Sequence, residues 1–151
     1  MSRQANIVPD EGRANSTELP FRRTIVAVEA AVCLSGLAGS IQLLAGVATP
    51  PTSVLSPLGL SSWAFPAGWL FLSVALPSGL AAWLAWQRSV WAPTAALVAS
   101  ALLAIELLVQ IPFLGPSILQ VIFGAVAVGM AVVSLLARRA GWRHAVSRHR
   151  Q

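Results

Sequence analysis

Four long apolar blocks dominate this sequence and leave few folds open to it. They cover residues 24–47, 63–86, 92–111 and 117–137, and proline, glycine or arginine separates one block from the next. Each block is close to the ~20 residues that a helix needs to cross the hydrocarbon core of a bilayer. Charged residues make up only 10% of the chain, whereas a typical soluble domain has about 25%. We therefore expect a membrane protein.

Helices are the form that we expect these blocks to take. An unpaired backbone group in lipid is very costly, so a spanning segment must be a helix or part of a closed barrel. The blocks are continuously apolar and lack the alternation of a transmembrane strand. We predict an all-α, polytopic membrane protein with a single four-helix transmembrane bundle over residues 22–139.

The arginines predict the orientation of the bundle. Arg22 and Arg23 precede the first block, Arg88 joins the second to the third, and the other arginines near the blocks follow the fourth. The connections 48–62 and 112–116 carry no charge. By the positive-inside rule, the arginine-bearing side faces the cytoplasm. We therefore predict a multi-pass protein of the cell membrane with both termini cytoplasmic.

Two tails flank the predicted bundle. Residues 1–21 are polar, lack apolar periodicity and are expected to form a disordered cytoplasmic tail. Residues 140–151 form a basic tail. We expect Arg138, Arg139 and Arg143 to contact anionic lipid headgroups, which attract arginine near a membrane surface.

A competing interpretation takes the first block as an export signal. Arg22 and Arg23 precede it, and it runs into the small residues of Gly46-Val47-Ala48. Against this, the stretch is longer than the core of a typical signal peptide, and it contains Glu29.

An acid in the third block is the first candidate site. Glu106 lies near the uncharged, outer end of its block, where no arginine is available, and an ionisable residue inside a span marks a functional site by default. Counting the helical rise places Gln42, Gln110 and Gln120 at a similar depth, with Trp63 closing the layer. Two interpretations stay open. The cluster is either a hydrogen-bonded clasp that fixes helix register or a ligand site.

Two further residues in the blocks are candidates for a special role. Glu29 lies nearer the arginine-bearing end of the first block, so it is a candidate for an ion pair with an arginine there or for a proton site. Pro77 lies near the middle of the second block. It is expected to kink the helix, because proline removes a backbone donor and frees the carbonyl of Ser73.

Several other function classes are disfavoured. The net charge of +5 comes from arginines beside apolar blocks, so nucleic acid is not an expected partner. His144 and His149 have no nearby carboxylate or thiol to complete a metal site. The sequence has no nucleophile elbow and no phosphate-binding glycine loop. We therefore predict no metal, no cofactor and no enzymatic activity.

Three features together resemble a known membrane protein group. The first block contains Gly36, Gly39 and Gly46, a proline-rich connection follows it, and the third block contains an acid. This plan resembles the small four-helix proteins of the DoxX-like group over residues 22–139. The chain lacks the basic residue expected near the end of the first span in that group. The resemblance implies an accessory membrane subunit and transfers no residue role.

A second similarity is to the small multidrug transporters. They also have four short helices and a membrane-embedded glutamate in the first helix, here Glu29. The tryptophan and glycine pattern expected later in that family is missing from this chain.

Together these observations favour a non-enzymatic accessory or assembly component with a small ligand site near Glu106, in the outer half of the bundle. The alternative is a proton-coupled small-molecule carrier that uses Glu29 or Glu106. The lipid bilayer is the expected partner, and a membrane protein or a second copy of the chain is a further candidate.

Overall fold

The protein is built from helices that form four candidate membrane spans. The computed structural model describes residues 21–47, 49–140 and 142. All regular structure in these residues is helical, and four helical segments are long and apolar enough to cross a bilayer. The predicted all-α, four-span fold is thus confirmed for the described residues. The elements are α1 (Arg22–Ala45), η1 (Thr52–Leu58), α2 (Ala64–Leu70), η2 (Phe71–Ala75), α3 (Leu76–Trp86), α4 (Ala92–Leu114) and α5 (Ile118–Arg139).

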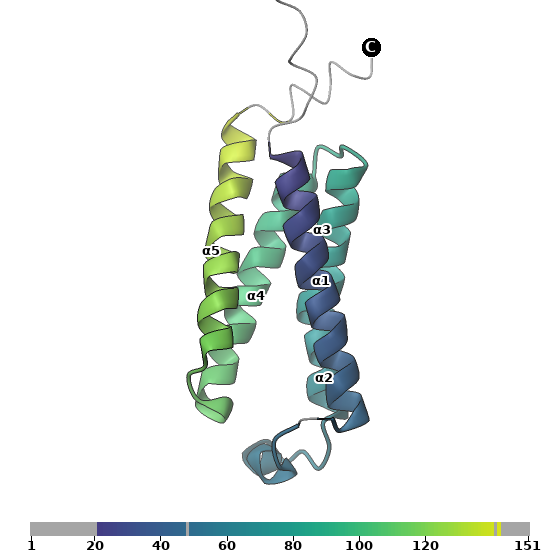
Figure 1. The fold of residues 1–151 in the computed structure, drawn as a ribbon, viewed down its shortest axis with the longest axis vertical. Helices are drawn as coiled ribbons and strands as arrows, with labels where there is room; N and C mark the ends of the chain where they lie inside the picture. Colours follow the sequence, from purple (N-terminus) through teal and green to yellow (C-terminus); the bar gives the residue numbers. More distant parts are fainter. Residues whose placement is uncertain (1–20, 48, 141, 143–151) are drawn as a thin grey trace, which may run out of the picture.

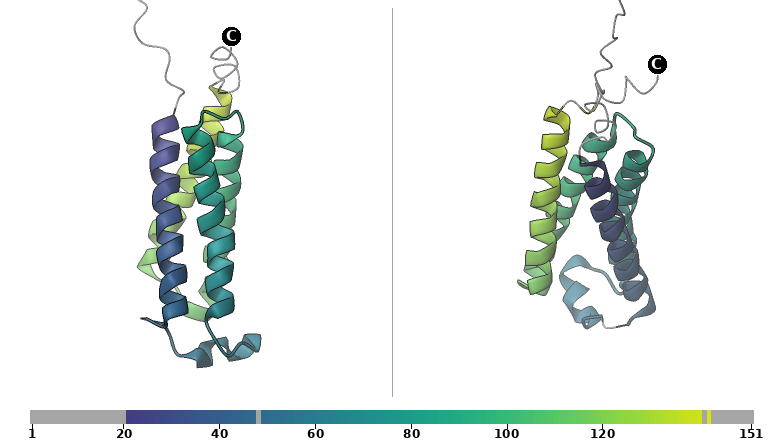
Figure 2. Two further views of the ribbon diagram at one scale, coloured as in Figure 1. Left: turned by 90° about the vertical axis from the view of Figure 1, so that its right-hand side faces the viewer. Right: turned by 45° about the horizontal axis from the view of Figure 1, so that its top comes forward.

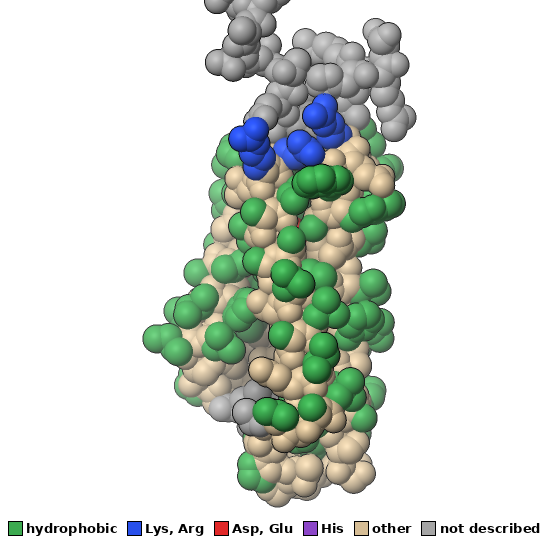
Figure 3. Space-filling view, turned by 45° about the vertical axis from the view of Figure 1, so that its right-hand side comes forward, with side chains coloured by type: hydrophobic (Ala, Val, Ile, Leu, Met, Phe, Trp, Pro, Cys, Tyr) green, Lys and Arg blue, Asp and Glu red, His purple; other side chains and the backbone are tan. Residues whose placement is uncertain are grey.

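The spans run up and down, so that alternate connections lie at opposite ends. The start of α1, the α3–α4 connection and the end of α5 lie at one end, and η1 and the α4–α5 turn lie at the other (Figures 1 and 2). The second span is continuous from Ala64 to Trp86 and combines α2, η2 and α3. Arginine side chains gather at the first end, which we call the arginine end, and hydrophobic side chains cover much of the face below it (Figure 3).

The surface of the bundle fits a lipid environment. Only 17% of the most apolar stretch of α5 is buried inside the protein, and large side chains such as Ile118 and Val121 are more than two-thirds exposed. Water would disfavour so continuous an apolar surface, whereas lipid tails match it. The protein is therefore a multi-pass membrane protein.

The four spans pack unevenly along their length. α1 packs along the second span, α4 packs along α5, and the contact between α3 and α4 joins these two pairs. α1 touches α5 only slightly, and the two helices diverge away from the arginine end (Figure 1). The bundle is therefore tight at the arginine end and open at the η1 end.

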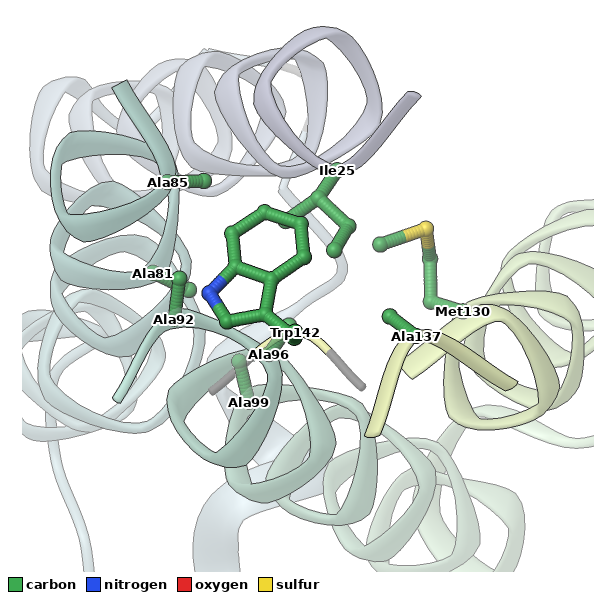
Figure 4. Packing of buried hydrophobic residues seen from close by; sticks show 9 residues of the cluster. All are labelled: Ile25, Ala81, Ala85, Ala92, Ala96, Ala99, Met130, Ala137 and Trp142. Atoms are coloured by element: carbon green, nitrogen blue, oxygen red, sulfur yellow. The ribbon is translucent and has the colours of Figure 1, made fainter. Parts of the chain in front are cut away.

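Trp142 fills the tight end of the bundle. Its side chain is 1% exposed and lies among Ile25 of α1, Met130 of α5 and a group of alanines from the other spans and α5, so that all four spans surround it (Figure 4). The indole Nε1 donates a hydrogen bond to the carbonyl oxygen of Ser89 at 2.9 Å. The alanines leave the space that a large ring needs between closely packed helices.

Arg22 ties the start of α1 to the end of α3. Its guanidinium donates hydrogen bonds to the carbonyl oxygens of Ala85 and Trp86, both at 3.2 Å. It also lies 5.7 Å from the centre of the Trp86 ring system, within range of a cation–π contact. These carbonyls belong to the last turn of α3, where the Ala85 carbonyl also accepts a hydrogen bond from the Arg88 N–H at 3.1 Å.

A widened helical turn interrupts the second span just before Pro77. The Leu76 N–H donates to the carbonyl of Phe71, five residues back, so η2 is a π turn. Pro77 then lies in the first turn of α3, where a missing N–H costs little. The kink predicted at Pro77 stays a prediction, and the structure has a π turn directly before this residue. Such turns change the direction of side chains locally and are frequent at functional sites.

A glycine lets α1 approach this π turn closely. A Cβ atom added to Gly36 would lie 3.1 Å from the backbone nitrogen of Ala75 and 3.2 Å from its Cβ. Small residues permit this kind of backbone contact between membrane helices.

Candidate functional site

Glu106 is the centre of a hydrogen-bonded cluster inside the bundle. The residue is 8% exposed and belongs to α4. Its Oε2 atom accepts hydrogen bonds from Trp69 Nε1 at 2.7 Å and from Ser73 Oγ at 3.2 Å. Its Oε1 atom accepts a bond from Gln110 Nε2 at 3.1 Å. Three donors from two spans thus converge on one carboxyl group.

The backbone explains why these donors meet. Gln110 lies one helical turn beyond Glu106 on α4, so the two share a face. Trp69 and Ser73 are four residues apart on α2 and the π turn η2, and both reach across to α4. Trp69 keeps 51% of its surface exposed while its N–H group points inward to the carboxylate.

Sequence reasoning predicted part of this cluster. It placed Gln110 beside Glu106, but on the second span it selected Trp63, whose Nε1 instead donates to the Pro50 carbonyl at 3.1 Å. Trp69 and Ser73 were missed. Trp69 and Ser73 each have one polar side-chain atom, and residues four apart lie on the same face of a helix. This pattern was the signal that could have identified them.

The two other predicted glutamines, Gln120 and Gln42, have different surroundings. Gln120 closes the N-terminus of α5, where its Oε1 accepts from the Ser117 N–H at 2.9 Å and its own N–H donates to Ser117 Oγ at 3.3 Å. It also lines the same cavity as Glu106. Gln42 is exposed and does not line that cavity.

A cavity of about 230 Å³ lies beside the Glu106 cluster. Its polar atoms come from Glu106, Gln110, Ser117, Gln120 and Ser35, and all four spans contribute to its wall. The rest of the wall is apolar and consists of Val32, Gly36, Gly39, Leu70, Val74, Leu103, Leu107, Leu119 and Phe123. The volume is below the roughly 300 to 1,000 Å³ of sites for drug-sized ligands, so the cavity suits a smaller molecule.

The carboxyl group has capacity for a further partner. A carboxylate has about four acceptor positions, and three are occupied here. The described arginines lie in or beside the ends of spans at the arginine end, so none of them lies beside Glu106. The site can therefore accept a hydrogen bond from a hydroxyl or ammonium group while apolar side chains surround the remainder of the molecule.

Glu29 lies at a second depth along the bundle, nearer the arginine end. We call the two depths the Glu106 level and the Glu29 level, and the Glu29 level is closely packed. Glu29 is 2% exposed, and its side chain is hydrogen-bonded to Ser78. Buried serines from the other two spans, Ser100 and Ser134, lie at a similar depth. The space beside Glu29 has no volume for a water molecule, and the guanidinium of Arg22 is directed to the end of α3 instead.

An apolar layer separates the two acids. Each span contributes one residue to it, namely Val32, Val74, Leu103 and Ala127, and these residues form one buried cluster. Val32 and Leu103 line both the Glu106 cavity and the space beside Glu29. The two levels are therefore stacked along the bundle with a single hydrophobic layer between them.

The remaining predicted residues lie at the arginine end or beyond it. Arg138 and Arg139 are exposed in the last turn of α5 and line a surface hollow there. Arg143 lies outside the described residues. Within residues 21–47, 49–140 and 142, no group of three or more potential ligands could hold a metal ion.

Comparison with known proteins gives no match for this chain. No protein family model matches it, and neither the curated proteins nor the solved structures contain a significant match. The similarity to the DoxX-like group therefore remains one of topology.

Proposed function

We propose that this protein is a non-enzymatic accessory or assembly component of the cell membrane that binds a small amphipathic molecule in the Glu106 cavity. A hydroxyl or amine of the ligand would bond to the free acceptor position of Glu106, and its apolar part would lie among the four spans. The observation that carries the proposal is a buried carboxyl group, held by three donors, in the wall of a cavity that is otherwise largely apolar.

The open packing of the spans supports entry from the lipid phase. The cavity is lined by both α1 and α5, the two spans that diverge toward the η1 end (Figure 1). Ser35 on α1 and Leu119 on α5 both line the cavity and remain exposed. An apolar molecule dissolved in the bilayer can therefore reach the cavity between these two helices.

The arrangement of the arginines supports a membrane orientation with the arginine end of the bundle, and so both chain termini, on the cytoplasmic side. Arg22, Arg88, Arg138 and Arg139 all lie in or beside the ends of spans at the arginine end. Clustering of arginine on one side of the membrane is the pattern that fixes topology in the positive-inside rule.

The test uses 6-bromohexan-1-ol as a probe, because bromine quenches tryptophan on contact and Trp69 lies at the cluster. In nanodiscs, we expect a saturable component of fluorescence quenching that Trp69→Phe removes. Ser35→Phe fills the cavity mouth and should also remove it. Ala38→Phe adds the same ring at an exposed position on α1 that does not line the cavity, so it should retain the component. Quenching that rises linearly in every variant would refute the binding proposal.

A second candidate function is a proton-coupled small-molecule carrier that uses Glu29 or Glu106. The observation that favours it is that Val32 and Leu103 line both the Glu106 cavity and the space beside Glu29. In proteoliposomes with an internal pH dye, a carrier would move protons when 6-bromohexan-1-ol is added, and Glu29→Gln would stop the movement. Saturable binding without any proton movement would favour the accessory role.

A further inference from the structure

The arginine end contains a second hollow that is separate from the Glu106 cavity. It has a volume of about 440 Å³ and lies between the start of α4 and the end of α5. Arg138, Arg139 and Thr94 provide its polar side chains. Val90, Pro93, Leu135 and Trp142 provide an apolar wall.

The two arginines in this hollow differ from Arg22 in their surroundings. Arg22 is held by two carbonyl oxygens and an indole ring, whereas Arg138 and Arg139 are exposed in the last turn of α5. The acids among the described residues are Glu29 and Glu106, and both are buried inside the spans. Within the described part of the chain, the hollow therefore has two positive charges without a carboxylate beside them.

The position of the hollow restricts what it can hold. It lies where two spans end, and Trp86 and Trp91 are exposed at the same end. Tryptophan at the ends of spans marks the headgroup region of a bilayer. A molecule in this place meets guanidinium groups on one side and an apolar wall on the other, which matches an anionic headgroup attached to acyl chains.

We propose that this hollow binds one anionic phospholipid, with its phosphodiester between Arg138 and Arg139 and its glycerol and upper acyl chain against Val90 and Leu135. Guanidinium groups suit phosphate oxygens because their N–H donors are planar and paired. The backbone N–H groups of Thr94 and Ala95 already donate to the Trp91 carbonyl. The arginine side chains are therefore the principal donors.

The experiment measures binding of phosphatidylglycerol by native mass spectrometry, with phosphatidylcholine as the zwitterionic comparison. Arg138→Gln and Arg139→Gln should each weaken binding of the first phosphatidylglycerol molecule about fivefold. One arginine near an anionic membrane surface contributes about 1 kcal/mol of binding free energy, which is about fivefold in affinity. Arg88→Gln removes a charge at the same end that does not line the hollow, and its effect should stay below about twofold. Phosphatidylcholine has the same phosphodiester but no net charge, so Arg138→Gln and Arg139→Gln should weaken its binding less than that of phosphatidylglycerol.

A filling variant tests the shape of the hollow without changing its charge. Thr94→Phe should weaken phosphatidylglycerol binding, and a circular dichroism melt would show that the variant remains folded. Equal losses in all three arginine variants would mean diffuse attraction and would overturn the proposal. Displacement of the lipid by inorganic phosphate at equal concentration would show an anion site without lipid recognition and would also overturn it.

Discussion

The two buried acids have opposite surroundings although they lie in the same bundle. Glu106 accepts three hydrogen bonds and borders a cavity of about 230 Å³, whereas Glu29 is bonded to Ser78 beside a space without room for water. The difference follows from helix packing, because α1 and α5 diverge on the Glu106 side (Figure 1). A polar group in a membrane protein can thus be a candidate binding site or a packed structural element, depending on the separation of the helices around it.

Replacing each acid with leucine should separate the two levels most clearly. Glu106→Leu leaves the Trp69 and Ser73 donors without their acceptor, and we expect it to lower the free energy of unfolding by about 2 to 4 kcal/mol, since each such bond contributes roughly 0.6 to 2 kcal/mol in a membrane. Glu29→Leu should cost about 1 kcal/mol or less, because Ser78 can bond to its own helix backbone. Unfolding in sodium dodecyl sulfate, followed by circular dichroism, measures both. Equal losses would mean that the two levels do not differ in this way.

The close approach of α1 to η2 should depend on Gly36. Gly36→Ala places a methyl group 3.1 Å from the Ala75 backbone nitrogen, and we expect a loss of about 1 to 3 kcal/mol from this overpacking. Gly129→Ala is the matched control, since nothing lies within 4 Å of its added Cβ. The control should be neutral or stabilising by up to about 1 kcal/mol, because alanine favours helix more than glycine does. The same unfolding assay applies, and a neutral Gly36→Ala would contradict the close contact.

Chemical labelling should distinguish the open level from the closed one. In a Cys33→Ala background, Leu107→Cys places a thiol in the cavity wall and Ser100→Cys places one at the Glu29 level. We expect N-ethylmaleimide to modify position 107 about tenfold faster or more, since thiol reactivity depends on access. Mass spectrometry of timed samples gives both rates. Similar rates would show that the Glu29 level opens readily and would favour the carrier.

The smallest expected effect concerns the α5 wall of the cavity. Ser117→Ala removes one half of the capping pair with Gln120, and loss of a helix cap costs about 1 kcal/mol. Because Gln120 also lines the cavity, the variant should alter the saturable quenching by 6-bromohexan-1-ol as well. A change in stability with no change in quenching would restrict the pair to a structural role.

The sequence by itself determined the number of spans, the clustering of arginine at one end and the depth of each polar residue. Depth follows from the sequence because each helical residue advances about 1.5 Å along the axis. The sequence could therefore predict that Glu106 and Gln110 lie side by side, since they are four residues apart on one helix.

Only the tertiary structure decided which side chains meet across helices. The spans carry few polar residues, so the sequence indicates only weakly which face of each helix turns inward. The structure has α1 in close contact with the second span at Gly36 and Ala75, next to a π turn before Pro77. In this packing Trp69 and Ser73 donate to Glu106 and Gln42 is exposed, although counting the helical rise predicts Gln42 at the same depth.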